Sequence, residues 1–224
     1  MTTPPGSNTA PSSELRSGPA GALRRLVLLH GWGADAHDLL ELGPLLVGAE
    51  VEVVALQAPW PHPAGMGRQW YDLQQPNWPE LPGARAALKQ RLLDLSRELP
   101  LESTILLGFS QGAAMVLDVG TLAEGLDGRS CAALIGCSGY PHPGWDPQTP
   151  HKTKVLLTHG EQDPVVPFAA SQALQEQLQA AGHGVELLGF SGGHTIDERL
   201  FPAMKRFIAN QWPNPSSVQT LNAP

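Results

Sequence analysis

The chain has 224 residues, with 14 Lys and Arg against 21 Asp and Glu, so its formal net charge is −7 at pH 7. That length fits one α/β domain with room for a pocket, or two small domains. The acidic balance and the lack of a basic run disfavour binding to a phosphate backbone, and no apolar stretch reaches the length of a membrane span. We therefore expect neither nucleic-acid binding nor an integral membrane segment.

The two ends of the chain differ in composition from its middle. Residues 1–22 are rich in Pro, Gly, Ser, Thr and Ala, and residues 213–224 are similar. Such segments bury too little apolar surface to offset the entropy of ordering. We therefore expect a disordered tail over 1–22, a folded domain over 23–212 and a flexible tail over 213–224. The first residues also lack the pattern of a signal peptide.

Six short apolar runs alternate with helix-like segments between the tails. Runs of this kind are typical of strands buried on both faces. They cover residues 26–30, 51–56, 104–109, 132–137, 155–159 and 185–190. Helical patterns follow over 84–99, 112–118, 167–181 and 196–210. Alternation of this sort predicts an α/β fold with a doubly wound, mostly parallel sheet flanked by helices.

Residues 57–83 interrupt the alternation with six prolines, three glycines and three tryptophans. Connections of this length commonly form lids or binding walls. Trp70, Leu73 and Trp78 are the large apolar residues of interest in it, and they are either core residues or the wall of an acyl pocket. We take them as candidate substrate-binding residues.

Residues 108–112 read Gly-Phe-Ser-Gln-Gly, which is the pattern G-x-S-x-G. An apolar run leads into it and a helix-like run follows, which is the strand–turn–helix context of a nucleophile elbow. A serine hydroxyl is a weak nucleophile by itself and needs a base and an acid. Ser110 is therefore the candidate nucleophile, and the N–H of Gln111, the residue after it, is one candidate oxyanion donor.

The base and the acid are expected at the same edge of the sheet as Ser110. Ligands bind at the carboxyl ends of parallel strands, and Asp163 and His194 each follow an apolar run closely. The order Ser, Asp, His is that of α/β hydrolases. In these roles His194 takes the serine proton and Asp163 orients the imidazole. Glu161 is a competing acid.

Several motifs together resemble the phospholipase/carboxylesterase family of α/β hydrolases, which includes the acyl-protein thioesterases. They are HGWGAD (30–35), RQWYDL (68–73), GFSQG (108–112), CSGY (137–140), HGEQDPVVP (159–167) and SGGHTI (191–196). The resemblance runs from residue 26 to residue 207. It implies the α/β-hydrolase fold, favours Asp163 over Glu161 as the acid, and makes the N–H of Trp32 the second oxyanion donor.

The remaining histidines and two carboxylates have simpler explanations. His30 and His159 end strands just before glycines and are predicted to be structural. His62 and His142 each sit between two prolines, which predicts rim or surface positions. No cluster has the ligand spacing of a metal site. Asp35 and Asp72 are candidate loop-bracing carboxylates.

Cys131 and Cys137 lie at the two ends of one expected strand. An extended segment holds residues six apart too far from each other for a disulfide. We therefore expect reduced packing residues, in a cytoplasmic protein.

The candidate triad and the family resemblance together predict a serine carboxylesterase that hydrolyses a small-molecule or lipid acyl ester through an acyl-enzyme, with no cofactor and no metal. A thioesterase or lysophospholipase is the alternative within enzymes. A non-catalytic binding module is a third alternative, because a fold does not fix a function. The sequence leaves the oligomeric state open.

Overall fold

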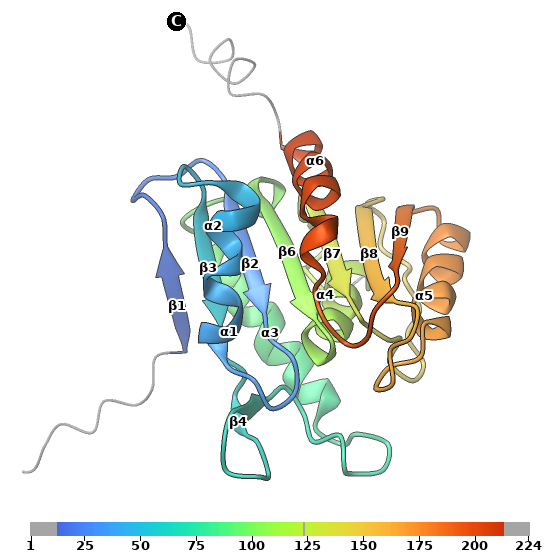
Figure 1. Ribbon diagram of the computed structural model, residues 1–224. Helices are drawn as coiled ribbons and strands as arrows, with labels where there is room; N and C mark the ends of the chain where they lie inside the picture. The colour runs from blue at the N-terminus through green and yellow to red at the C-terminus, as the bar shows by residue number, and fades with distance from the viewer. Residues whose placement is uncertain (1–12, 123, 213–224) are drawn as a thin grey trace, which may run out of the picture.

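The computed structural model describes residues 13–122 and 124–212. A seven-stranded sheet with the order β1-β3-β2-β6-β7-β8-β9 runs through the molecule, and helices cover both of its faces (Figure 1). Its strands are β1 (Glu14–Ser17), β2 (Arg25–Leu29), β3 (Glu52–Leu56), β6 (Thr104–Phe109), β7 (Ala133–Cys137), β8 (Lys154–Gly160) and β9 (Gly184–Phe190). All neighbouring strands are parallel except β1, which pairs antiparallel with β3. The predicted fold class is confirmed.

The sheet divides the core into two apolar layers, and helices cover each of them. One layer joins the sheet to α3 (Leu81–Leu95), α4 (Gln111–Thr121) and α5 (Ala169–Ala180). The other joins it to α1 (Ala36–Leu40), α2 (Leu42–Val47) and α6 (Phe201–Gln211), which lie in front of the sheet in Figure 1. Strands β2 and β7 are buried at every position, which is why, apart from Arg25 at the start of β2, they read as unbroken apolar runs.

The helices and strands that the sequence predicts are present with small shifts at their ends, but α1 and α2 were not expected. They have five and six residues, too few to show a helical period. Asp35 marks the start of α1, because its side chain accepts a hydrogen bond of 2.8 Å from the N–H of His37. Asp72 accepts a similar bond from the N–H of Gln74, so both carboxylates brace local turns.

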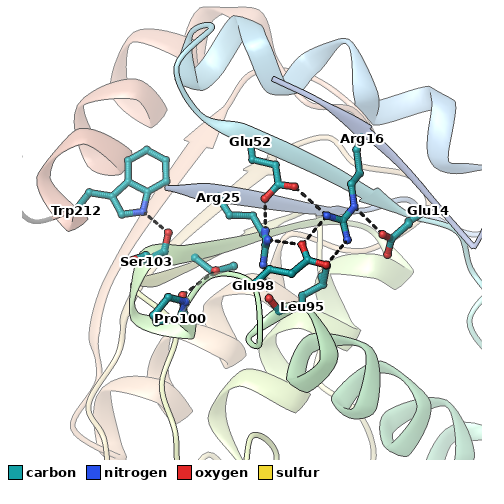
Figure 2. A network of polar contacts seen from close by, with 10 residues as sticks. Glu14, Arg16, Arg25, Glu52, Leu95, Glu98, Pro100, Ser103 and Trp212 are labelled. Atoms are coloured by element: carbon teal, nitrogen blue, oxygen red, sulfur yellow. Dashed lines mark hydrogen bonds and ion pairs between the residues drawn. The ribbon is translucent and has the colours of Figure 1, made fainter. Parts of the chain in front are cut away.

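The prediction of a disordered tail over 1–22 is wrong for its last part, because β1 lies inside it. Residues 1–12 lie outside the described residues. Leu15 packs against the core, and the Arg16 guanidinium bonds to Glu14, Glu52 and Glu98 at 2.6 to 3.0 Å (Figure 2). Ion pairs with partners far along the chain leave no local pattern, so composition alone missed this strand.

Figure 2 also shows Arg25, which is 1% exposed and lies at the start of β2. Its guanidinium bonds to Glu52, to Glu98 and to the carbonyl oxygen of Leu95. This cluster ties β1, β2 and β3 to the end of α3. It lies at the amino ends of the parallel strands, so the carboxyl ends remain free for chemistry.

The segment over 57–83 forms a short hairpin of β4 (Trp60–Pro61) and β5 (Arg68–Gln69), followed by turns that lead into α3. Arg68 fastens it to the first loop, since the Arg68 carbonyl accepts from Gly33 N and the Arg68 N–H donates to Ala34 O. The segment therefore lies at the carboxyl edge of the sheet, next to the loop that follows β2 (Figure 1).

Candidate active site

Ser110 occupies the sharp turn between β6 and α4 with φ 53° and ψ −117°. A non-glycine residue in this region is strained, and such strain is commonly held at functional sites. The flanking glycines make the turn possible. A Cβ on Gly112 would lie 2.2 Å from the Leu29 carbonyl oxygen, and one on Gly108 would lie 2.3 Å from the carbonyl oxygen of Gly112.

Three side chains from three loops meet at this turn. The Ser110 hydroxyl lies 2.9 Å from Nε2 of His194, and Nδ1 of the same imidazole lies 2.7 Å from Oδ2 of Asp163. With a proton on Nδ1 donated to the carboxylate, Nε2 is free to accept the serine proton. Glu161 is exposed. The arrangement can therefore activate the Ser110 hydroxyl, and the carboxylate in contact with His194 is that of Asp163.

The carboxylate of Asp163 is held by the backbone as well as by His194. Its Oδ1 accepts hydrogen bonds from the N–H groups of Val165 and Val166 at 2.8 and 2.9 Å. Burial favours a raised pKa for this carboxyl, but the bonds from His194 and the two N–H groups outweigh burial, so its pKa lies below the usual value. Asp163 therefore stays ionised beside the imidazole.

His159 and His30 are structural, as predicted: His30 is 1% exposed, and its two ring nitrogens bond to the Gly31 carbonyl and the Ala58 N–H. The imidazole of His159 is 0% exposed and lies between the hydroxyl of Ser171 and the carbonyl of Val166, at 2.6 and 2.8 Å. Burial lowers its pKa, so the ring is neutral. Its Nε2 donates to Val166 and also lies 3.3 Å from Oδ2 of Asp163, which makes it a brace for the acidic loop.

The two candidate oxyanion donors lie in the loop after β2 and at the first residue of α4. No acceptor among the described residues pairs with the backbone N–H of Trp32 or of Gln111. The side chains of these residues are fixed instead. Gln111 binds Trp70 N and Tyr71 O at 2.9 and 2.8 Å, and the Trp32 indole donates to Gln69 at 2.8 Å. Residues 69–71 therefore hold both donors in place.

Two cavities adjoin Ser110 and share Trp32, Ser110 and His194. The one we call the loop-side cavity has a volume of about 400 Å³. Its other walls are Leu73, Trp78, Tyr140, Val165, Val166, Pro167 and Ala170. The one we call the helix-side cavity has a volume of about 450 Å³ and extends over Leu39, Leu42, Ile196 and Phe201, with Asp38 and Glu198 also in its lining.

The candidate substrate-binding residues separate in the structure. Leu73 and Trp78 line the loop-side cavity. Trp70 lines neither cavity: it is 1% exposed, packs in the core and donates its indole N–H to the carbonyl of His30 at 2.9 Å. The prediction that Trp70 contacts the substrate is therefore wrong. Trp70 instead stabilises the turn at Ser110, because its backbone N–H donates to the side chain of Gln111.

The rim prediction for His142 is also wrong, whereas His62 is half-buried and packs edge-on against Trp32. His142 is 4% exposed and bonds to Asp118 and to the Tyr71 hydroxyl. The feature of the sequence that could have indicated a buried His142 is Asp118. A carboxylate inside the apolar run of α4 requires a buried partner, and sequence alone does not say which.

Cys131 and Cys137 are free and fully buried, and burial raises the pKa of the Cys137 thiol to about 11. Neither is a reactive thiolate. Within residues 13–122 and 124–212, no group of three His, Cys, Asp or Glu side chains is placed to hold a metal ion. In the same ranges, no helix is both long and apolar enough to cross a bilayer.

A model of the Phospholipase/Carboxylesterase family matches residues 13–212. The chain belongs to the phospholipase/carboxylesterase family. It is accordingly an α/β hydrolase that acts on carboxylic esters. Its match to the family begins at residue 13, just before β1, so the strand missed by composition belongs to the family domain.

Named relatives agree with this assignment. Esterase YpfH of Escherichia coli (strain K12) is 33% identical over 189 residues, which cover 80% of this chain and 78% of that protein. Acyl-protein thioesterase 1 of Neurospora crassa is 26% identical over 132 residues, covering 54% of this chain and 51% of that protein. The crystal structure of esterase PE8 has a TM-score of 0.78 and 29% identity, covering 89% of this chain and 97% of that one.

Proposed function

We propose that this carboxylesterase works through Ser110 as nucleophile, His194 as general base and acid, and Asp163 as the carboxylate that orients the imidazole. The observation that carries the proposal is the continuous hydrogen-bonded path from the Ser110 hydroxyl through His194 to Asp163, with distances of 2.9 and 2.7 Å. Mutual contact of nucleophile, base and orienting group is the geometry that nucleophilic catalysis requires.

The reaction then has two halves. Ser110 Oγ attacks the acyl carbonyl while His194 Nε2 takes its proton, and the imidazolium returns the proton to the leaving alcohol as the acyl-enzyme forms. Water attacks the acyl-enzyme in the same way and releases the acid. The oxyanion of each tetrahedral intermediate is received by the N–H groups of Trp32 and Gln111, which have no acceptor among the described residues.

The two cavities divide the substrate between them. The loop-side cavity has apolar walls of Leu73, Trp78, Val165 and neighbouring residues, which suits an acyl chain. The helix-side cavity includes Asp38 and Glu198, both exposed, which suits a polar leaving group and the entry of water. Burial of each CH₂ of the chain contributes up to about 0.8 kcal/mol to binding.

A fluorophosphonate probe tests the role of Ser110 directly. The native chain should bind one probe per molecule on Ser110 and lose hydrolysis of p-nitrophenyl esters in step. Ser110→Ala and His194→Ala should each lower kcat by about 10⁴ or more, and the double variant should fall little further. Ser191→Ala removes an exposed serine at the same edge and is the matched control.

Multiplicative losses in the double variant would contradict a shared role, and labelling of another serine would contradict Ser110 as the nucleophile. Paired oxygen and sulfur esters of one acyl group would separate esterase from thioesterase preference. The buried, unpaired cysteines support a reducing, cytoplasmic location for this activity.

A further inference from the structure

A buried row of polar side chains runs from α3 to the wall of the loop-side cavity. The guanidinium of Arg85 lies 2.6 Å from Oδ2 of Asp118, and the same oxygen is bonded to Nδ1 of His142. On the other side of the imidazole, Nε2 lies 2.8 Å from the Tyr71 hydroxyl, which is 2.7 Å from the hydroxyl of Tyr140. Asp118, His142 and Tyr71 are 1%, 4% and 0% exposed.

The charge at the start of this row fixes the direction of each proton along it. Asp118 is paired with Arg85, and a carboxylate only accepts hydrogen bonds, so Nδ1 of His142 is the donor. Burial lowers the pKa of His142, so the ring is neutral and its Nε2 is an acceptor. The Tyr71 hydroxyl therefore donates its proton to His142.

Tyr140 is the last member of the row. Burial raises the pKa of Tyr71, so the phenol keeps its one proton, and that proton points at His142. The Tyr71 oxygen can therefore only accept a hydrogen bond from the Tyr140 hydroxyl. The Tyr140 hydroxyl is thus a donor toward Tyr71, and it has accepting lone pairs left for other partners. Tyr140 is half-buried and lines the loop-side cavity together with Ser110 and His194.

We propose that Tyr140 is a specificity-determining residue, and that the loop-side cavity selects acyl chains bearing a hydroxyl or another hydrogen-bond donor over plain or ether-bearing chains. The proposal rests on the proposed function, because it takes the acyl chain to occupy this cavity. The donor of the substrate is received by Tyr140 Oη, while the apolar walls hold the rest of the chain.

The selection follows from the fixed direction of the Tyr140 proton. A hydroxyl on the chain completes a hydrogen bond to Oη. An ether oxygen has no proton to give, so two acceptors face each other, and a plain chain offers no hydrogen bond to Oη. A hydrogen bond of ordinary net strength corresponds to a preference of about three- to tenfold.

The test uses p-nitrophenyl hexanoates that carry hydrogen, hydroxyl or methoxy on carbon 2, 3 or 6. Hydroxyl and methoxy groups at one carbon have similar inductive effects, so their ratio of kcat/KM, compared with the same ratio in Tyr140→Phe, separates the hydrogen-bond donor from the added methyl group. We expect the hydroxyl ester to exceed the methoxy ester about three- to tenfold at one or more positions. A ratio at or below one at every position would overturn the proposal.

Two variants test the direction of the protons. Tyr140→Phe should bring the hydroxyl-to-methoxy ratio close to one. Tyr71→Phe removes the acceptor for the Tyr140 proton, which can then point into the cavity, so the ratio should invert in favour of the methoxy ester. An unchanged ratio in Tyr71→Phe would refute the proton order. A general loss of folded enzyme does not move this ratio.

Should Tyr71→Phe fail to fold, His142→Leu gives the same test, because Tyr71 then turns its proton toward Tyr140. Failure of this proposal is distinct from failure of the proposed function. Turnover of plain hexanoate and labelling of Ser110 report on the proposed function alone. If both hold while the native ratio stays at one, the selectivity proposal falls and the esterase mechanism stands.

Discussion

At the scale of single residues, the two oxygens of Asp163 have separate partners. Oδ1 accepts from the N–H groups of Val165 and Val166, and Oδ2 accepts from His194 Nδ1. An asparagine at this position must keep its oxygen on the two backbone donors. Its amide NH₂ would then face the imidazole and require Nδ1 to be the acceptor.

Asp163→Asn should for that reason hold His194 in the wrong tautomer, with the proton on Nε2 where the Ser110 proton has to go. We expect kcat to fall by about 10⁴, with the melting temperature changed by a few degrees at most. Steady-state kinetics and thermal melting check this outcome. Glu161→Gln, an exposed acid two residues earlier, is the matched control and should be mild. A larger loss in Glu161→Gln would identify the wrong acid.

Single-residue positions are also where the sequence is most informative. Ser110, Asp163 and His194 follow apolar runs whose ends share one edge of a parallel sheet, so the strand pattern is enough to bring them together. Tyr71, Asp118 and His142 could not be assembled in that way. Their contacts depend on how α4 packs against loops 24 and 40 positions distant in sequence, and no periodicity encodes that packing.

At the scale of elements, the segment over 57–83 contributes two different things. Gln69 and Trp70 fix the backbone around the oxyanion donors, whereas Leu73 and Trp78 form a cavity wall. Proline and tryptophan content predicts that such a segment has a structural or binding role. It cannot say which tryptophan faces inward, because the segment has no regular period.

Trimming the cavity wall should change the dependence on acyl length. The native enzyme should show kcat/KM rising from acetyl toward medium-chain p-nitrophenyl esters as CH₂ groups enter the loop-side cavity. Leu73→Ala should flatten the rise and affect acetyl turnover least. Leu45→Ala, an exposed leucine of α2 outside both cavities, is the matched control. A uniform loss at all lengths, with a lower melting temperature, would mean that Leu73 only supports the segment.

Strand β1 leads to a prediction about the stability of the fold and not about its activity. Deleting residues 1–18 removes the antiparallel partner of β3 and leaves Glu52 and Glu98 without Arg16. We expect a melting temperature lower by several degrees and aggregation through the exposed strand edge. Deletion of 1–12, which leaves β1 in place, is the control. Equal melting temperatures for the two truncations would show that β1 contributes nothing measurable.

At the scale of the whole molecule, buried neutral histidines determine how stability depends on pH. Burial lowers the pKa of His30, His142, His159 and His183 below the usual value of about 6.5. Below that pH the unfolded chain binds protons that the folded chain does not. Stability that is fully present above pH 6.5 is therefore lost as the pH falls toward the folded-state values.

Urea unfolding at pH 8, 7, 6 and 5 measures this effect. The free energy of unfolding should be level above pH 7 and fall below 6.5, by up to ~1.4 kcal/mol per pH unit for each such histidine. His183→Asn should reduce the slope, whereas His37→Asn, at an exposed position, should leave it as it is. A free energy that stays constant from pH 8 to pH 5 would contradict the assignment of neutral buried rings.

The direction of β1 determines where the two ends of the described chain lie. Glu14 pairs with Leu56 at the carboxyl end of β3, so the chain enters the sheet at the edge that carries Ser110, three strand positions or about 14 Å to one side. Trp212 is bonded to the carbonyl of Ser103 (Figure 2), which precedes β6 at the opposite edge of the sheet. An enzyme anchored to a solid support at Trp212 would thus have its active site directed toward the bulk solution. One anchored at Glu14 would turn that site toward the support.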